Sequence, residues 1–158
     1  MSMNTIPAHI FGLFLAVGVG VLVGVGLFTF LYADGHAYLQ DDPLVCANCH
    51  IMQPQYDSWM ASSHQNVATC NDCHTPKGLI PKYISKADNG FRHAWAFTFD
   101  NFYEPIQIIP RNQRVLQNQC VHCHGDLVHP ILDEDNNPQC VNCHFNVGHA
   151  GHQRPQRF

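Results

Sequence analysis

The chain has 158 residues, of which 46% are hydrophobic and only 13% are charged, and its formal net charge is −4 when histidine is neutral. This length fits one domain with a short appendage, and the negative charge gives no electrostatic support for binding nucleic acid. Eight cysteines and twelve histidines are unusually many for so short a chain, and they direct attention to a metal or haem protein.

An apolar segment without a charged side chain occupies residues 10–32. About 20 apolar residues in a helix span the hydrocarbon core of a bilayer. A cleavable signal peptide has a shorter apolar region, of roughly 7–15 residues, behind a basic start. Here no Lys or Arg precedes the segment, and the first basic residue of the chain is Lys77. The sequence therefore predicts an uncleaved transmembrane helix, with residues 1–35 as an N-terminal anchor.

All eight cysteines follow the anchor and belong to four C-x-x-C-H motifs, at 46–50, 70–74, 120–124 and 140–144. This pattern is the signature of covalent c-type haem, because two thiols one helical turn apart attach one porphyrin and the adjacent histidine reaches its iron. A zinc site, a thioredoxin-like pair or a disulfide framework does not explain a histidine after every pair. The sequence predicts four haem c groups, attached through Cys46, Cys49, Cys70, Cys73, Cys120, Cys123, Cys140 and Cys143.

The spacing of the motifs predicts the domain organisation. The first cysteines of successive motifs are 24, 50 and 20 positions apart, which indicates a module at 46–74, an insert at 75–119 and a module at 120–149. Residues 36–158 are too few to build an ordinary core around four haems, so the porphyrins must supply the buried apolar mass. We expect a mostly α or irregular fold, in which short helices wrap around four haems behind a single transmembrane helix. Haem is attached outside the bacterial inner membrane, so this part belongs in the periplasm.

Distal iron ligands must come from outside the motifs. The candidates are His36, His64, His93, His122, His129, His149, His152, Met52 and Met60. His149 follows His144 by five residues, which is too close to reach the opposite face of the same haem easily, so the third haem is its expected site. By the same reasoning, His64 precedes Cys70 by six residues and should serve a haem other than the second.

The first two motifs carry a resemblance to a known family. The pattern C-x-x-C-H-I-M-x-P at 46–54, followed by His64 and by CNDCHTP at 70–76, resembles the NapC/NirT family of membrane-anchored tetrahaem quinol dehydrogenases. The short region after Cys140 resembles the branch that passes electrons from menaquinol to the catalytic subunit of cytochrome c nitrite reductase, which makes ammonium. The resemblance implies menaquinol as electron donor, the membrane quinol pool and a periplasmic multihaem reductase as partners, and no nucleic acid. Another periplasmic reductase is the alternative partner.

The resemblance also implies the iron ligands. Met52 takes the place of His50 at the first haem, although His50 is the ligand that an ordinary motif would supply. At the other three haems the motif histidines bind. The full set of expected ligands is Met52 for haem 1, His74 for haem 2, His124 with His149 for haem 3, and His144 with His64 for haem 4. This set leaves haem 2 without a distal ligand.

The insert between the modules carries the second functional signal. Lys82, Lys86, Asn89 and His93 recur at the spacing of one helix face, with aromatic residues around them. Oxidation of a quinol needs a hydrogen-bond donor and a base. By resemblance, Lys86 matches the family's quinol-site lysine, His93 stands at the position of its acid, and Asp88 is the alternative carboxylate. The competing interpretation is an amphipathic helix that only lies on lipid headgroups.

Two other functional classes remain open from the sequence. A self-contained reductase would bind its substrate directly at a haem with an open coordination position. A haem-based sensor or structural subunit would need neither a quinol site nor a partner reductase. Reduction of the purified chain by quinol separates these classes from a quinol dehydrogenase, because only the last expects it.

Overall fold

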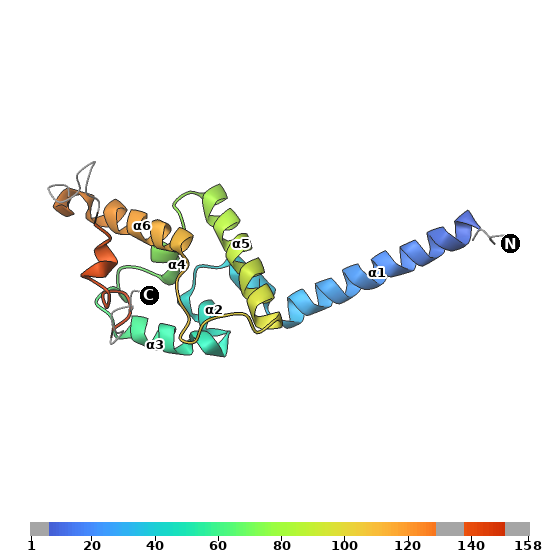
Figure 1. Cartoon of the computed structure of the whole chain (residues 1–158), viewed down its shortest axis with the longest axis horizontal. Helices are drawn as coiled ribbons and strands as arrows, with labels where there is room; N and C mark the ends of the chain where they lie inside the picture. Colours follow the sequence, from blue (N-terminus) through green and yellow to red (C-terminus); the bar gives the residue numbers. More distant parts are fainter. Residues whose placement is uncertain (1–6, 129–137, 151–158) are drawn as a thin grey trace. The chain divides into compact units, whose positions relative to one another are not determined.

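The computed structural model describes residues 7–128 and 138–150, and these residues form helices and loops without a β-strand. The chain divides into two units, Met1–Ala37 and Tyr38–Phe158. The first unit consists of one long helix and the second of several shorter helices (Figure 1). The expected mostly α-helical and irregular fold is confirmed.

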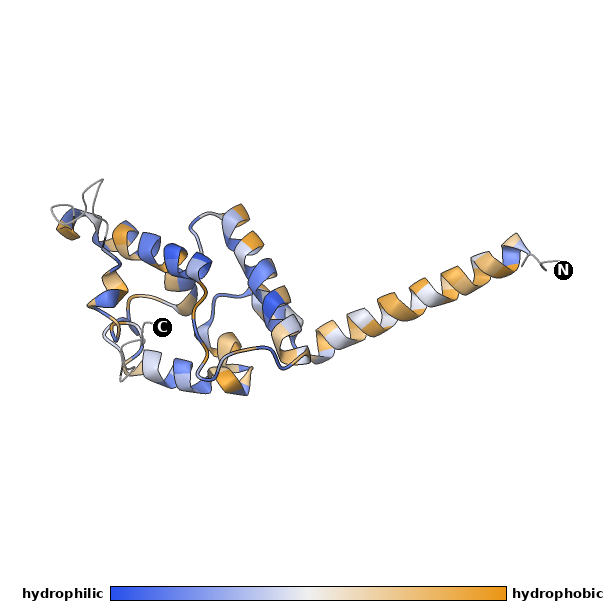
Figure 2. Cartoon of the chain, viewed as in Figure 1, coloured by the Kyte–Doolittle hydropathy of each residue, from blue (hydrophilic) through white to orange (hydrophobic). Residues whose placement is uncertain are grey.

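Helix α1, Ala8–Tyr32, is the main element of the first unit. Its 25 residues give a length of about 37 Å at 1.5 Å per residue, enough to cross the hydrocarbon core of a bilayer. None of its residues is buried in the structure, and Figure 2 shows hydrophobic colour along nearly its whole length. A helix that is apolar on all sides and covered by no protein fits the expected membrane anchor.

The second unit contains the four haem-attachment motifs. Its helices, together with the short helix η1 at the boundary of the units, are η1 Gly35–Leu39, α2 Pro43–Ala47, η2 His50–Met52, α3 Gln53–Met60, α4 Cys70–His74, α5 Leu79–Thr98, α6 Pro110–Val128 and η3 Cys140–Asn142. Helix α4 packs against α6, so the second motif lies beside the third, while α2 packs against α3 and α4.

Local capping signals fix where these helices begin. Thr69 and Asp72 form a capping box, with the Thr69 backbone N–H donating to the Asp72 carboxylate at 2.9 Å, so α4 begins at the first cysteine of its motif. The Asp42 carboxylate caps α2 by accepting from the Leu44 backbone N–H at 2.9 Å. Gly78 precedes α5 with a φ of 93°, a conformation that glycine adopts without strain.

The second unit has almost no apolar core of its own. Among its described residues no hydrophobic side chain is buried, and the buried residues are polar: Ser62, Thr75, Ser85, Lys86, Gln117 and Gln119. A domain of this size normally relies on buried apolar side chains for its stability. Four porphyrins would supply that missing apolar mass, as the sequence predicts.

Candidate haem ligands and quinol site

The four motifs lie on different kinds of local structure. The first motif leaves the end of α2, the second forms α4, the third lies within α6, and the fourth begins in η3. Gln117 of α6 holds the fourth motif in place, because its side-chain oxygen accepts from the Cys140 backbone N–H at 2.9 Å and its amide donates to the Pro138 carbonyl at 3.2 Å. All eight cysteines are free of disulfides, so every thiol is available for a porphyrin vinyl group.

The motif histidine of α4 faces a second imidazole. The ring centres of His74 and His149 are 6.2 Å apart. Two imidazoles that share one iron, each through a metal–nitrogen bond of about 2 Å, have ring centres about 6 Å apart. Burial, with His149 contributing, lowers the pKa of His74 to about 4, so the ring is neutral near pH 7, as a metal ligand must be.

The orientation of His149 also suits an iron ligand. Its Nδ1 lies 3.1 Å from the Gln55 carbonyl and 3.1 Å from the Ser58 hydroxyl oxygen. A carbonyl can only accept, so Nδ1 carries the proton and donates it there, and Nε2 is the unprotonated nitrogen that a metal would bind. Metal-bound histidines are commonly held by such a bond from the other ring nitrogen.

The motif histidine of α6 has the same arrangement. The ring centres of His124 and His64 are 6.2 Å apart, with an interplanar angle of 70°. The Nδ1 atom of His64 lies 3.1 Å from the Ser63 hydroxyl oxygen, and the His64 backbone N–H donates to Ser62 Oγ at 3.2 Å. These bonds hold His64 beside Ser62 and Ser63 while its ring lies opposite His124.

These pairs differ from the ones expected from the sequence. His149 lies opposite His74 and not His124, so it faces the second motif where the third was expected. His64 lies opposite His124 and not His144, so it faces the third motif where the fourth was expected. Three-dimensional packing decides which motif each histidine faces, and the spacing of residues along the sequence does not contain that information.

Among the described residues, no imidazole faces the histidine of the first or the fourth motif. In the ranges 7–128 and 138–150, no ring pair includes His50 or His144. His50 is exposed whereas Met52 is partly buried, which fits Met52 as the ligand of the first haem. Of the other candidates, His36 is ion-paired with Asp34 at 2.9 Å, and His129 and His152 lie outside the described residues.

The donor groups fit haem better than a zinc ion. Within the part of the chain that the structure describes, no group of three or more His, Cys, Asp and Glu side chains could hold a metal ion. Structural zinc needs four such ligands. An iron in a porphyrin needs only two axial ligands from the protein, and the two imidazole pairs provide that number. The residues present therefore fit haem c.

Lys86 of α5 is a buried cation close to the first motif. Its side chain is only 9% exposed, and its ammonium donates to the Gln40 carbonyl at 2.5 Å and to the Asp41 carboxylate at 3.1 Å. Gln40 and Asp41 come just before α2, the helix that contains Cys46, so Lys86 is held near the start of the first motif. A hydrogen bond from Cys70, with the positive charge of Lys86 contributing, lowers the pKa of the Cys46 thiol to about 7. The ammonium also lies 5.8 Å from the centre of the Tyr83 ring.

His93 lies on the same face of α5 and faces Tyr38. The Tyr38 hydroxyl and His93 Nδ1 are 3.4 Å apart. Burial, with Cys49 and Cys46 contributing, raises the pKa of Tyr38, so this ring too is near the first motif. Desolvation lowers the pKa of His93, which keeps its imidazole neutral and able to accept a proton near pH 7.

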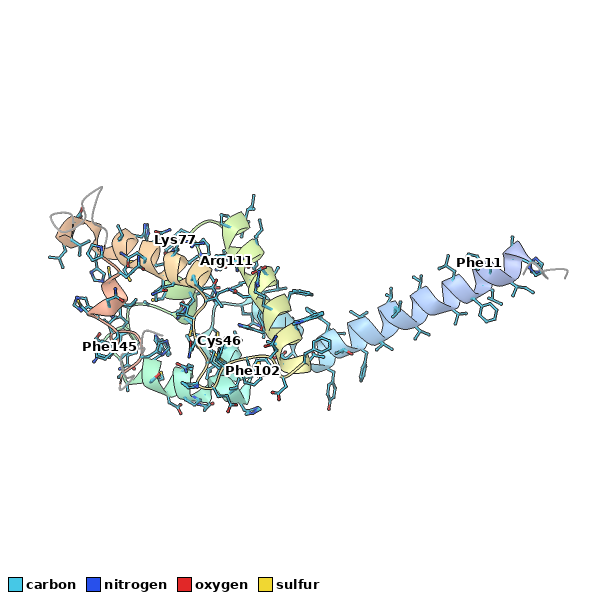
Figure 3. The ribbon with its side chains drawn as sticks, viewed as in Figure 1. Phe11, Cys46, Lys77, Phe102, Arg111 and Phe145 are labelled. Carbon is cyan, nitrogen blue, oxygen red and sulfur yellow. The ribbon has the colours of Figure 1, made fainter. Side chains whose placement is uncertain are left out.

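Asp88 does not belong to this group. Its carboxylate is ion-paired with Arg92 at 2.9 Å and with Arg111 at 2.5 Å, and Figure 3 shows Arg111 near α5. Hydrogen bonding from Arg92 and the charge of Arg111 lower the pKa of Asp88. A carboxylate held by two guanidinium groups is a poor proton acceptor, so the structure disfavours Asp88 as the alternative base.

Asp41 is the site residue that the sequence did not reveal. Its carboxylate pairs with both Lys82 and Lys86, which are more than 40 positions away in the sequence. The hydrogen bond from Lys82 is the main cause that lowers the pKa of Asp41, and Lys86 contributes. It also lines a surface cavity of about 400 Å³, together with Asp72, Lys77 and Lys82. No motif or spacing in the sequence connects Asp41 with α5, because the two segments are more than 40 positions apart.

Comparison with known proteins gives the same assignment for most of the chain. The profile of the NapC/NirT cytochrome c family, N-terminal region, matches residues 7–118. The cytochrome c-type protein NrfH of Wolinella succinogenes is 38% identical over 81% of this chain and 81% of its own length. The cytochrome c nitrite reductase subunit NrfH of Nitratidesulfovibrio vulgaris is 32% identical over 85% of this chain and 82% of its own length.

A solved structure agrees with these relatives. The crystal structure of the cytochrome c nitrite reductase NrfHA complex bound to the HQNO inhibitor contains a chain that matches with a TM-score of 0.65 and 28% identity. The match covers 91% of this chain and 99% of that one. With four haem-attachment motifs and this family match, the chain is a tetrahaem c-type cytochrome that belongs to the NapC/NirT cytochrome c family.

Proposed function

We propose that this chain oxidises menaquinol at a site built around Lys86 and passes the electrons to a periplasmic nitrite reductase. The observation that carries the proposal is the buried Lys86 ammonium beside the first haem-attachment motif. A buried lysine is costly unless it has a partner or a function. The named relatives and the NrfHA complex support nitrite reductase as the partner, and another periplasmic reductase is the alternative.

Lys86 and the residues around it would have separate roles in quinol oxidation. The Lys86 ammonium would donate a hydrogen bond to a quinol oxygen and stabilise the negative charge that develops as the proton leaves. Neutral His93, hydrogen-bonded to Tyr38, would accept a proton. Asp41 contacts Lys86 and also lines the surface cavity, so it would give protons a route toward water. A bound haem c supplies an acceptor for one electron at a time.

The imidazole pairs support a direction for the electron path. His74 with His149, and His64 with His124, would each hold the iron of one haem, and the fourth motif would supply His144. Met52 would serve the first haem. The haem near Lys86 would then receive electrons, and the haem at the fourth motif, with one position not filled by the described residues, would face the partner.

The proposal also includes the cellular location of the chain. Residues 1–35 would anchor the chain in the bacterial inner membrane, and residues 36–158, including the modules 46–74 and 120–149 and the insert 75–119, would lie in the periplasm, where haem is attached. The 25-residue helix α1 supports a single crossing.

Reconstitution of the complete chain tests the proposal. The protein is placed in vesicles with a menaquinol analogue, and reduction of its haems is followed by absorbance, before and after addition of nitrite reductase and nitrite. We expect rapid reduction, then reoxidation only when the reductase is present. Reoxidation by another reductase alone supports the alternative partner. Reoxidation by nitrite without a reductase, or no reduction by menaquinol, contradicts the proposal.

A further inference from the structure

Helix α5 buries polar side chains and exposes apolar ones, which is the reverse of a helix on the surface of a soluble protein. Its buried residues are Ser85 and Lys86, whereas the side chains of Ile80, Ile84 and Phe91 are exposed by 71%, 64% and 66%. In water, burial of apolar side chains and exposure of charged ones is the favourable arrangement. This inversion needs an apolar environment outside the helix.

The exposed apolar residues form one continuous face. Ile80, Ile84, Phe91 and Trp95 lie at spacings that a helix with 3.6 residues per turn brings to the same side. Lys86 and the other polar residues near the first haem lie roughly half a turn away. We call Ile80, Ile84, Phe91 and Trp95 the outer face of α5. Figure 2 shows the resulting mixture of hydrophobic and hydrophilic colour on α5, in contrast to α1.

Among the described residues, α5 contacts η1 and α6 through side chains that do not belong to its outer face. Polar side chains on its other sides hold it: Lys86 bonds to Asp41 at 3.1 Å, and the Tyr83 hydroxyl donates to the Leu39 carbonyl at 3.1 Å. Arg111 of α6 pairs with Asp88 at 2.5 Å. These contacts leave the outer face uncovered, while polar side chains elsewhere on α5 hold the helix to Leu39, Asp41 and Arg111.

We infer that the outer face of α5 lies in the lipid bilayer, at the boundary between headgroups and acyl chains. The chain carries its own membrane span, and Tyr32 at the end of that span is followed by Tyr38 of the second unit after at most about 20 Å of extended chain. The bilayer is thus the apolar phase always within reach. This second membrane contact goes beyond the anchoring by α1.

The residues of the outer face suit the boundary between lipid headgroups and acyl chains. Trp95 contacts Phe99 with ring centres 4.5 Å apart and Phe91 at 6.2 Å, and tryptophan and aromatic residues concentrate at membrane interfaces. Asp88 and Arg92, paired at 2.9 Å, lie beside the apolar stripe at headgroup level. With 20 residues, α5 is about 30 Å long and lies in the interface as an amphipathic helix.

A photoactivatable phospholipid tests this contact in the complete haem-loaded protein. The chain is reconstituted in vesicles of phosphatidylethanolamine and phosphatidylglycerol that contain a phospholipid with a diazirine in its acyl chain, and adducts are mapped by mass spectrometry. We expect adducts on α1 and on the outer face of α5. Val67, which is 78% exposed but lies outside α5, should carry none. Adducts on α1 alone, or equally on Val67, overturn the inference.

Matched variants separate lipid from protein as the occupant. Ile84→Glu combined with Phe91→Glu should reduce α5 adducts about tenfold or more, because two charges are placed in the apolar layer. Adducts on α1 and the content of four haems should stay unchanged, as they should in Val67→Glu. If a second copy or the reductase covers the face, α5 stays unlabelled in the wild type and the double variant changes the mass of the complex, which overturns the inference. The readout needs no quinol oxidation, so it is independent of the proposed function.

Discussion

The second and third haem-attachment motifs differ from the first and fourth in what faces their histidines. His74 and His124 each face another imidazole with ring centres 6.2 Å apart. In the described ranges, His50 and His144 face none. Two histidines on an iron close both axial positions, whereas a haem with a different or missing ligand remains open to tuning or to a partner. The comparison suggests closed haems in the interior of the electron path and adaptable haems at its two ends.

The largest expected effect concerns the first motif, where a bond to iron would be lost. Met52→Ala should change the spectrum and reduction potential of one haem out of four, because a thioether ligand raises the potential. Spectropotentiometric titration of the purified variant measures this change. His50→Ala is the control and should leave the four potentials as they are. A silent Met52→Ala with a changed haem in His50→Ala would restore the ordinary ligand.

The next effect concerns Lys86, the buried cation near the first motif. Lys86→Leu should slow haem reduction by a menaquinol analogue by about tenfold to a hundredfold, since a lost charge-assisted hydrogen bond costs about 1.5–3 kcal/mol. Dithionite should still reduce all four haems. Stopped-flow absorbance measures both rates.

Lys82→Leu is the matched control, one turn earlier on α5. Its side chain is 23% exposed, compared with 9% for Lys86, and it shares Asp41 as a partner. We expect a smaller loss of rate in this variant. Equal and small losses in both variants would favour a helix that only contacts the membrane over a quinol site.

The smallest effect is expected at Asp88, which lies on α5 but outside the proposed quinol site. Asp88→Asn should leave the rate with menaquinol within about twofold, because the carboxylate is held by Arg92 and Arg111. Its main consequence should be lower thermal stability, measured by the loss of helical circular dichroism on heating. Asp126→Asn, exposed on α6, serves as the control. A large loss of menaquinol oxidation in Asp88→Asn would return Asp88 to the site.

The pH dependence of this stability has a definite sign. Hydrogen bonding from Arg92, followed by the charge of Arg111, lowers the pKa of Asp88 below 3.8, so the folded protein binds fewer protons here than the unfolded one. The stabilisation is fully present above pH 3.8 and is lost as the pH falls through the lower folded pKa. The difference between wild type and Asp88→Asn should therefore close in acid.

Much of this molecule could be predicted because its signals are local. The membrane helix follows from apolar composition, the haem attachment from the C-x-x-C-H pattern, and the polar face of α5 from helical spacing. The pairing of His149 with His74 could not be predicted, since it depends on how the end of the chain packs on α3 through Ser58 and Gln55. Asp41 was missed for the same reason, because its contact with Lys86 joins segments distant in sequence.

The most direct test of the closed interior haems is to find which iron His149 serves. Two double variants are compared by electron paramagnetic resonance: His149→Ala with His74→Met, and His149→Ala with His124→Met. If His149 and His74 share an iron, the first variant alters one haem out of four and the second alters two. Two altered haems in the first variant and one in the second would place His149 on the third haem and contradict the pairing.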